Sequence, residues 1–302
     1  MALGGVSVDA PPSTPSAFVG GEPPKDDHAD RRPSGSSTSE WSPWLAPLAL
    51  VAGLVLAAVG GLIVDIPALA FGVDVNASHL PPGLSIADTA VQDAAFVGVS
   101  VFCAQIGGRA VSAAMFGLRP TQLWRAVRLI VALIAAFLLF SLIWASIFHT
   151  SEEKLLEQLG ANESTLLLVL SAGLTCIVAP IGEEFLFRGF IFTALRNWRG
   201  LWPAAIITGL LFGAVHAGSA PALDLLPLAG LGFGLCLLYR ATGSLYPCIA
   251  AHCINNSLAF GSLEHWSWQI PILMVASLLV LLLLGLGLTQ AGVSSRVPAQ
   301  SA

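Results

Sequence analysis

Charged residues are scarce in this sequence and make up only 10% of its 302 positions. Soluble domains carry about a quarter charged residues, because their surfaces have to be hydrated. Here 55% of the residues are hydrophobic, and the mean hydropathy is +0.80. The scarcity of charge excludes an ordinary soluble domain and predicts a chain that faces lipid over most of its length.

Basic stripes and paired-cysteine motifs are missing as well. The 13 Lys and Arg residues form no basic stripe, so we expect no nucleic-acid partner. The five cysteines all lie in apolar stretches and show no CxxC spacing. Cysteines in such surroundings are typical of small buried positions rather than of disulfides or metal sites.

Several apolar runs reach the roughly 20 residues that a helix needs to cross a bilayer. We therefore predict an all-α fold, a polytopic transmembrane helical bundle. About eight spans are expected, at residues 44–71, 91–117, 126–148, 165–197, 202–218, 221–240, 244–261 and 267–290. Asp93 is expected near the start of the second span as an interfacial cap. The fourth segment is too long for one straight crossing, and Pro180 and Gly182 predict a kink just before Glu183.

The chain is expected to have four parts. Residues 1–42 are rich in Pro, Ser, Asp and Glu and lack apolar periodicity, which predicts a disordered tail. Residues 43–118 hold two transmembrane helices, residues 119–262 form a membrane core, and residues 263–302 hold the last helix and a short tail.

Lys and Arg residues predict the orientation, because they favour cytoplasmic loops. They precede the first span and follow the second, fourth, sixth and eighth, whereas the other loops are mostly acidic or uncharged. This alternation predicts that both termini lie in the cytoplasm. Its regularity and the absence of an ER-retention tail favour a bacterial plasma membrane.

A few polar and ionisable residues lie inside the predicted spans, where each costs a few kcal/mol and is usually functional. They are Glu183, Glu184 and Arg188 in the fourth span, His216 in the fifth, and His252 and Asn256 in the seventh. At 1.5 Å of rise per residue, Glu183 and His216 lie about 20 Å, and His252 about 12 Å, from the cytoplasmic ends of their helices. All three can therefore meet in one cavity near the middle of the membrane.

Helical spacing assigns different surroundings to the two adjacent glutamates. Glu184 and Arg188 are four residues apart and can pair on one face, whereas Glu183 points about 100° away and has no partner in the motif. An unpaired carboxylate in a site of low dielectric is a candidate general base. Phe212 lies one turn before His216 and can pack against it.

Structural roles also have to be weighed for these residues. The Glu184–Arg188 pair can serve only to fix the kink, and single His or Asn residues in spans often join helices through hydrogen bonds. Six such residues on three spans, at compatible depths and largely at one-turn spacings, favour a functional site.

Three motifs in this order resemble those of a known family. EEFLFR (183–188) fits EExxxR, FGAVH (212–216) fits FxxxH, and HCINN (252–256) fits HxxxN. Residues 119–261 thus resemble the CAAX protease and bacteriocin-processing family of intramembrane proteases, also called the Abi or type II CAAX prenyl endopeptidase family. The tail and the first two spans lie outside the resemblance.

The resemblance implies roles for the motif residues. Glu183 would be the catalytic glutamate and would activate water together with His216. His252 and Asn256 would stabilise the oxyanion, while Glu184, Arg188 and Phe212 would support the site. The implied substrate is a peptide or protein, and the resemblance leaves open whether it is lipidated or embedded in the bilayer.

Three alternatives stay open at this point. Glu183, His216 and His252 are ligand types found in catalytic zinc sites, so zinc is an alternative cofactor, although no cofactor is favoured and HExxH is absent. Intramembrane Glu and His also suit a proton-coupled carrier, but we see no internal repeat. The third alternative is a non-catalytic scaffold or immunity factor that retains the motifs for stability.

Overall fold

The structure is a computed structural model, and it describes residues 1, 41–75, 80–108, 110–148 and 158–290. The tail predicted over residues 1–42 lies almost wholly outside the described residues. Within the described residues the chain forms helices and no β-strand, which confirms the all-α prediction.

Six helices in the described part are long and apolar enough to cross a membrane. They are α1 (Leu45–Ala70), α2 (Pro82–Gln105), α3 (Leu123–Ile147), the continuous helix Thr165–Arg199, α9 (Leu225–Thr242) and α11 (Gln269–Gln290). The other two expected spans correspond to α8 (Leu201–Ala214), which has only 14 residues, and to α10 (Tyr246–Leu263), which is more polar. The protein is an integral membrane protein.

The helix α2 differs from the predicted second span. It begins at Pro82 rather than at residue 91 and ends at Gln105. Asp93 therefore lies inside the helix and is only 2% exposed, so the prediction of an interfacial cap was wrong. Polar residues lower the hydropathy of the first half of α2, although Thr89 and Gln92 line an internal cavity instead of facing lipid.

The helix Thr165–Arg199 changes its winding twice near the EExxxR motif. Its parts are α5 (Thr165–Gly173), the π-helical segment η2 (Leu174–Val178), α6 (Ala179–Glu184), the π-helical segment η3 (Phe185–Phe192) and α7 (Thr193–Arg199). Proline disturbs the helix before it, because it lacks an N–H group and its ring meets the carbonyl four residues earlier. The interruption of the helix that was expected at Pro180 therefore takes the form of wider, π-helical turns in η2. Such turns are frequent at functional sites.

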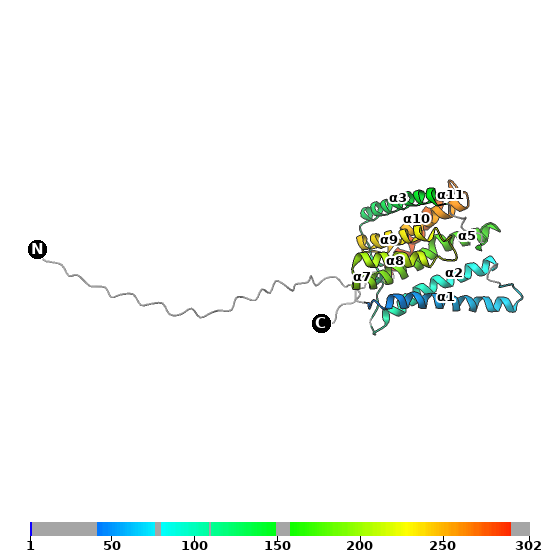
Figure 1. Ribbon diagram of the computed structural model, residues 1–302, viewed down its shortest axis with the longest axis horizontal. Helices are drawn as coiled ribbons and strands as arrows, with labels where there is room; N and C mark the ends of the chain where they lie inside the picture. The colour runs from blue at the N-terminus through cyan, green and yellow to red at the C-terminus, as the bar shows by residue number, and fades with distance from the viewer. Residues whose placement is uncertain (2–40, 76–79, 109, 149–157, 291–302) are drawn as a thin grey trace. The chain divides into compact units, whose positions relative to one another are not determined.

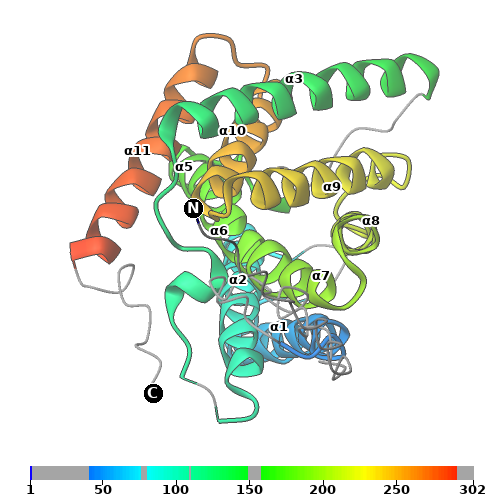
Figure 2. The ribbon, with the colours of Figure 1, turned by 90° about the vertical axis from the view of Figure 1, so that its left-hand side faces the viewer.

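This long helix is the centre of the bundle (Figures 1 and 2). The pair α1 and α2 packs against it, and α8, α9 and α10 contact it as well. Outside this centre, α3 packs on α9 and α10, and α11 packs on α10. The centre of the fold therefore coincides with the helix that carries the EExxxR motif.

Glycines allow α8 and α9 to approach closely beside the motif helix. A Cβ atom added at Gly209 would lie 2.8 Å from the carbonyl oxygen of Ala229, and one at Gly232 would lie 2.8 Å from the Cβ of Phe212. Small residues at such crossings are the usual means of close packing between transmembrane helices. The close approach places Phe212 on α8 directly against Gly232 on α9.

Candidate active site

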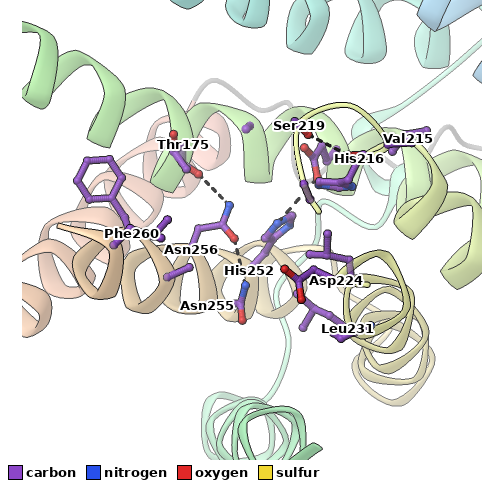
Figure 3. Close-up of a pocket in the computed structure, with 18 of the residues that line it drawn as sticks. Thr175, Val215, His216, Ser219, Asp224, Leu231, His252, Asn255, Asn256 and Phe260 are labelled. Carbon is purple, nitrogen blue, oxygen red and sulfur yellow. Dashed lines mark hydrogen bonds and ion pairs between the residues drawn. The ribbon is translucent and has the colours of Figure 1, made fainter. Parts of the chain in front are cut away.

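A cavity of about 610 Å³ opens beside the motif helix, and all four predicted catalytic residues line it. Glu183, His216, His252 and Asn256 reach it from α6, from the end of α8 and from α10. Figure 3 shows His216 and His252 lying on either side of one hollow. The structure thus brings together the residues that the sequence places on three separate spans.

Glu184 lies behind the cavity, in a fully buried network. Its Oε1 atom accepts a hydrogen bond from Arg188 Nη1 at 2.7 Å, and both side chains are 0% exposed. The same oxygen lies 2.9 Å from Nδ1 of His252, whereas the other oxygen, Oε2, has no hydrogen-bond partner among the described residues. Burial of a charge is tolerated when a partner and hydrogen bonds compensate for the lost hydration. Glu184 is therefore already engaged and is unsuited to act on a substrate.

Arg188 is held by more than its carboxylate partner. Its Nη2 atom donates to the carbonyl of Gly232 at 3.0 Å, and its guanidinium carbon lies 4.4 Å from the centre of the Phe212 ring. Thr193 Oγ1, at the start of α7, donates to the carbonyl of Arg188 in the π-helical segment at 3.0 Å. Arg188 consequently joins the motif helix to both α8 and α9.

Glu183 has very different surroundings from Glu184. It lines the cavity, its side chain is 12% exposed, and its Oε2 atom has no hydrogen-bond partner within the described part of the chain. The basic group that the described residues place near this oxygen is His252, whose Nε2 lies 3.9 Å away, which is too far for a hydrogen bond. Glu183 is thus the glutamate that remains free to act on a molecule in the cavity.

Both histidines use Nδ1 to hold their orientation. His252 Nδ1 contacts the Glu184 carboxylate at 2.9 Å, and His216 Nδ1 contacts the carbonyl of Phe212 at 2.7 Å. Because both partners are acceptors, Nδ1 carries the hydrogen in each ring. Nε2 is then left in each ring for chemistry, as an acceptor when the ring is neutral and as a donor when it is protonated.

Two asparagines extend the polar side of α10. Asn256 Nδ2 donates to the carbonyl of Thr175 at 2.9 Å, and Asn255 Nδ2 donates to Asn256 Oδ1 at 3.2 Å (Figure 3). The carbonyl of Thr175 lies in the widened segment η2. One of the two amide hydrogens of Asn256 is thereby used to fix the side chain, and the second remains.

Phe212 is fully buried between the charged groups and the cavity. Its ring centre lies 5.0 Å from that of His216 and 5.6 Å from that of His252. Together with its contact to Arg188, this makes Phe212 the apolar partner of three functional side chains. The packing of Phe212 against His216 agrees with their one-turn spacing.

The cavity residues that were missed in the sequence include Asn255 and Asp224. Asn255 comes three residues after His252, so helical spacing alone places both on one face and could have identified it. Asp224 was expected only as a charge in an outer loop, because no periodic pattern indicates where a loop side chain points.

A further buried acid, Asp93, lies behind the motif helix. A Cβ atom added at Gly182 would be 3.0 Å from the Cβ of Asp93, so α2 and α6 approach closely just before Glu183. Neither carboxylate oxygen of Asp93 has a hydrogen-bond partner within the described residues. The second transmembrane helix thus brings an unpaired acid next to the motif.

Comparisons with known proteins agree with this arrangement. Residues 165–258 match the family model described as "Type II CAAX prenyl endopeptidase Rce1-like". The resemblance to this family is confirmed for that segment. The segment contains Glu183, Glu184, Arg188, His216, His252 and Asn256.

One curated relative is a protein of Bacillus subtilis (strain 168) named "Putative membrane peptidase YdiL". It is 37% identical over 81 residues, which are 27% of this chain and 32% of the relative. The chain thus matches about a third of the length of that relative. No solved structure matches the chain significantly.

Proposed function

We propose that this protein is an intramembrane endopeptidase in which Glu183 and His216 activate water for hydrolysis of a peptide bond. The observation that carries the proposal is the different engagement of the two adjacent glutamates. Oε1 of Glu184 is occupied by both Arg188 and His252, and Glu184 does not line the cavity. Glu183 lines the cavity, and neither Arg188 nor another residue of the described chain donates a hydrogen bond to its Oε2 atom.

The first step is the attack of water on the substrate carbonyl carbon. Glu183 takes a proton from this water, and Nε2 of His216 accepts the hydrogen bond that orients it. General bases of this kind accelerate reactions by about 10²- to 10⁴-fold. A new C–O bond forms, and the electron pair of the carbonyl moves to its oxygen.

The resulting oxyanion is stabilised from α10. The second amide hydrogen of Asn256 and an N–H group at Nε2 of His252 are the donors, and the contact between Nδ1 and the Glu184 carboxylate fixes the orientation of the His252 ring. The C–N bond then breaks, and Glu183 returns its proton to the leaving amine. No covalent intermediate between enzyme and substrate is required.

A metal-free site is preferred over the zinc alternative. The described residues contain no group of three or more His, Cys, Asp or Glu side chains placed to hold a metal ion. His216 and His252 come from different helices, and no mechanistic step is assigned to a metal. Chelation of the purified enzyme followed by zinc addition tests this preference, and loss of activity that zinc restores would reverse it.

The proposed substrate is a peptide or protein that is lipidated or embedded in the membrane. The proposed location is a bacterial plasma membrane with both termini in the cytoplasm, supported by the alternation of Arg residues between loops. Reporter fusions at both ends of the chain test this orientation, and a signal from the outer side would contradict it.

The function is tested by cleavage of a fluorogenic peptide library, with and without a prenylated cysteine, by detergent-purified protein. Wild type and the Glu163→Gln control, which changes an exposed acid, should cleave the same peptides, whereas Glu183→Gln should cleave none at a comparable rate. Cleavage restricted to prenylated peptides would assign a lipidated substrate. Equal cleavage by Glu183→Gln would contradict the proposal.

A further inference from the structure

Asp224 is an acidic residue that the proposed mechanism leaves without a role. It lies immediately before α9 and lines the same cavity as Glu183 and His252. In Figure 3 its carboxylate projects from the start of α9 toward the hollow that His252 and Asn255 reach from α10. The side chain is only partly exposed.

An aspartate at this position usually caps the following helix, because its oxygens accept backbone N–H groups of the first turn. Asp224 does not do so, since its side chain makes no capping hydrogen bond to α9. Its backbone is nonetheless fixed, because its N–H donates to the carbonyl of Pro221 at 2.9 Å and its carbonyl accepts from Leu228 at 3.0 Å. The backbone of Asp224 is therefore fixed, and its carboxylate is not used by its own helix.

The segment before Asp224 is also tied to a second helix. Trp144 Nε1 on α3 donates to the carbonyl of Leu223 at 3.0 Å, and Trp144 itself lines the cavity. This bond joins α3 to the residue that precedes Asp224. The position of Asp224 relative to the cavity is thus set by two elements rather than by a free loop.

Among the residues that the structure describes, no Lys or Arg lines the cavity as a partner for Asp224. The ionisable residues that line the cavity in this part of the chain are Glu183, His216, Asp224 and His252. Nδ1 of each histidine is already held elsewhere, by Phe212 or by Glu184. Burial raises the pKa of Asp224, because a partly dehydrated carboxylate is less stable than a hydrated one. A cation entering the cavity would restore the lost stabilisation.

We propose that Asp224 is a specificity residue that binds a positively charged group of the substrate, an ammonium or a guanidinium. The inference rests on the proposed peptidase function and specifies its substrate class, a peptide that carries a cation near the cleaved bond. The cation can be a Lys or Arg side chain or a free amino terminus. A charge-assisted hydrogen bond of this kind gives a preference of about ten-fold or more.

Matched peptides around one cleavable sequence test this inference. The parent peptide is neutral, is N-acetylated and has norleucine at the positions flanking the cleaved bond. Two further sets carry Lys or Glu at each of these positions in place of norleucine. The last peptide is the parent with a free amino terminus. Wild type and the Glu163→Gln control should show a kcat/KM for at least one cationic peptide that is about ten-fold or more above the neutral parent. Preference for a Lys peptide assigns a side chain, and preference for the unblocked parent assigns the amino terminus.

Substitution of Asp224 should remove this preference. In Asp224→Asn the ratio of kcat/KM between cationic and neutral peptides should fall close to one, and in Asp224→Lys the Glu peptide should become the favoured substrate. The reversal distinguishes recognition of charge from a loss of folding, which lowers all rates together. A wild type without preference, or an Asp224→Asn variant that keeps it, would overturn the inference.

A binding arm separates this inference from the proposed function. Fluorescent versions of the same peptides are titrated into Glu183→Gln protein with Asp224 intact and into the Glu183→Gln, Asp224→Asn double variant. Tighter binding of cationic peptides only when Asp224 is intact supports the inference whether or not cleavage is seen. Equal binding to both proteins contradicts it, even if the peptidase function holds.

Discussion

Two buried acids in two regions of the molecule have opposite surroundings. Glu184 lies in the segment that matches the family, is 0% exposed, and contacts Arg188 and His252 at 2.7 and 2.9 Å. Asp93 lies in α2, outside that segment, is 2% exposed, and has no hydrogen-bond partner for either oxygen among the described residues. Burial is nearly the same, so the difference lies in compensation of the charge.

The two regions also differ in how much of each helix is covered by protein. In the most apolar stretch of each helix, the share buried inside the protein is 11% for α1 and 28% for α2. The corresponding shares are 33% for the helix Thr165–Arg199 and 44% for α9. The matched segment is therefore the packed centre, with a paired polar network. The N-terminal pair is more lipid-facing, yet it supplies Leu54, Thr89, Gln92 and Phe96 to one wall of the cavity.

The largest effect on stability is expected when Glu184 loses the side chain that pairs with it. Arg188→Met leaves Glu184 buried without its strongest partner, which should lower the free energy of unfolding by about 3–5 kcal/mol. Thermal unfolding in detergent measures the loss. The double variant Glu184→Gln, Arg188→Met removes both charges and should recover much of the stability without activity. A double variant no more stable than Arg188→Met would contradict the role of charge compensation.

A matched pair of leucines tests the difference in packing. Leu186 on the motif helix is 0% exposed, whereas Leu283 on α11 is 66% exposed. Leu186→Ala leaves a cavity and should cost about 2–5 kcal/mol, while Leu283→Ala should stay within about 0.5 kcal/mol. Unfolding of both variants under the same conditions provides the measurement. Similar costs at the two positions would show that the centre and the periphery are not distinct.

A smaller effect of opposite sign is expected at the unpaired acid. Asp93→Leu keeps a similar branched shape and removes a buried polar group without a partner, so the protein should become more stable by about 1–3 kcal/mol. The thermal midpoint should rise accordingly. A lower midpoint would mean that Asp93 has a stabilising partner after all, and the comparison with Glu184 would fail.

The sequence predicted the paired residues better than the unpaired ones. One-turn spacing within a helix places Glu184 beside Arg188 and Phe212 beside His216, because helix geometry alone decides those neighbours. Depth along the spans also predicted that Glu183, His216 and His252 can share a cavity. These relations depend only on local geometry and on a common membrane depth.

The remaining features depend on which way a helix or loop faces. Asp93 was expected at an interface because hydropathy counts its charge without regard to the face that it occupies. The inward direction of Asp224 and the use of α2 as a cavity wall follow from packing between distant segments. The contact of His252 with Glu184 also joins two helices, so no spacing within one of them predicts it.

The decisive measurement is a comparison of Glu183→Gln with Glu184→Gln, with kcat on one cleaved peptide and the thermal midpoint determined for both. Glu183→Gln should keep a thermal midpoint near that of wild type. Its kcat should fall by about 10²- to 10⁴-fold, because the base is removed from an intact site. Glu184→Gln should unfold at a clearly lower temperature, because the charge of Arg188 is left without its partner. Wild-type kcat in Glu183→Gln would contradict the assignment of Glu183 as the base that activates water.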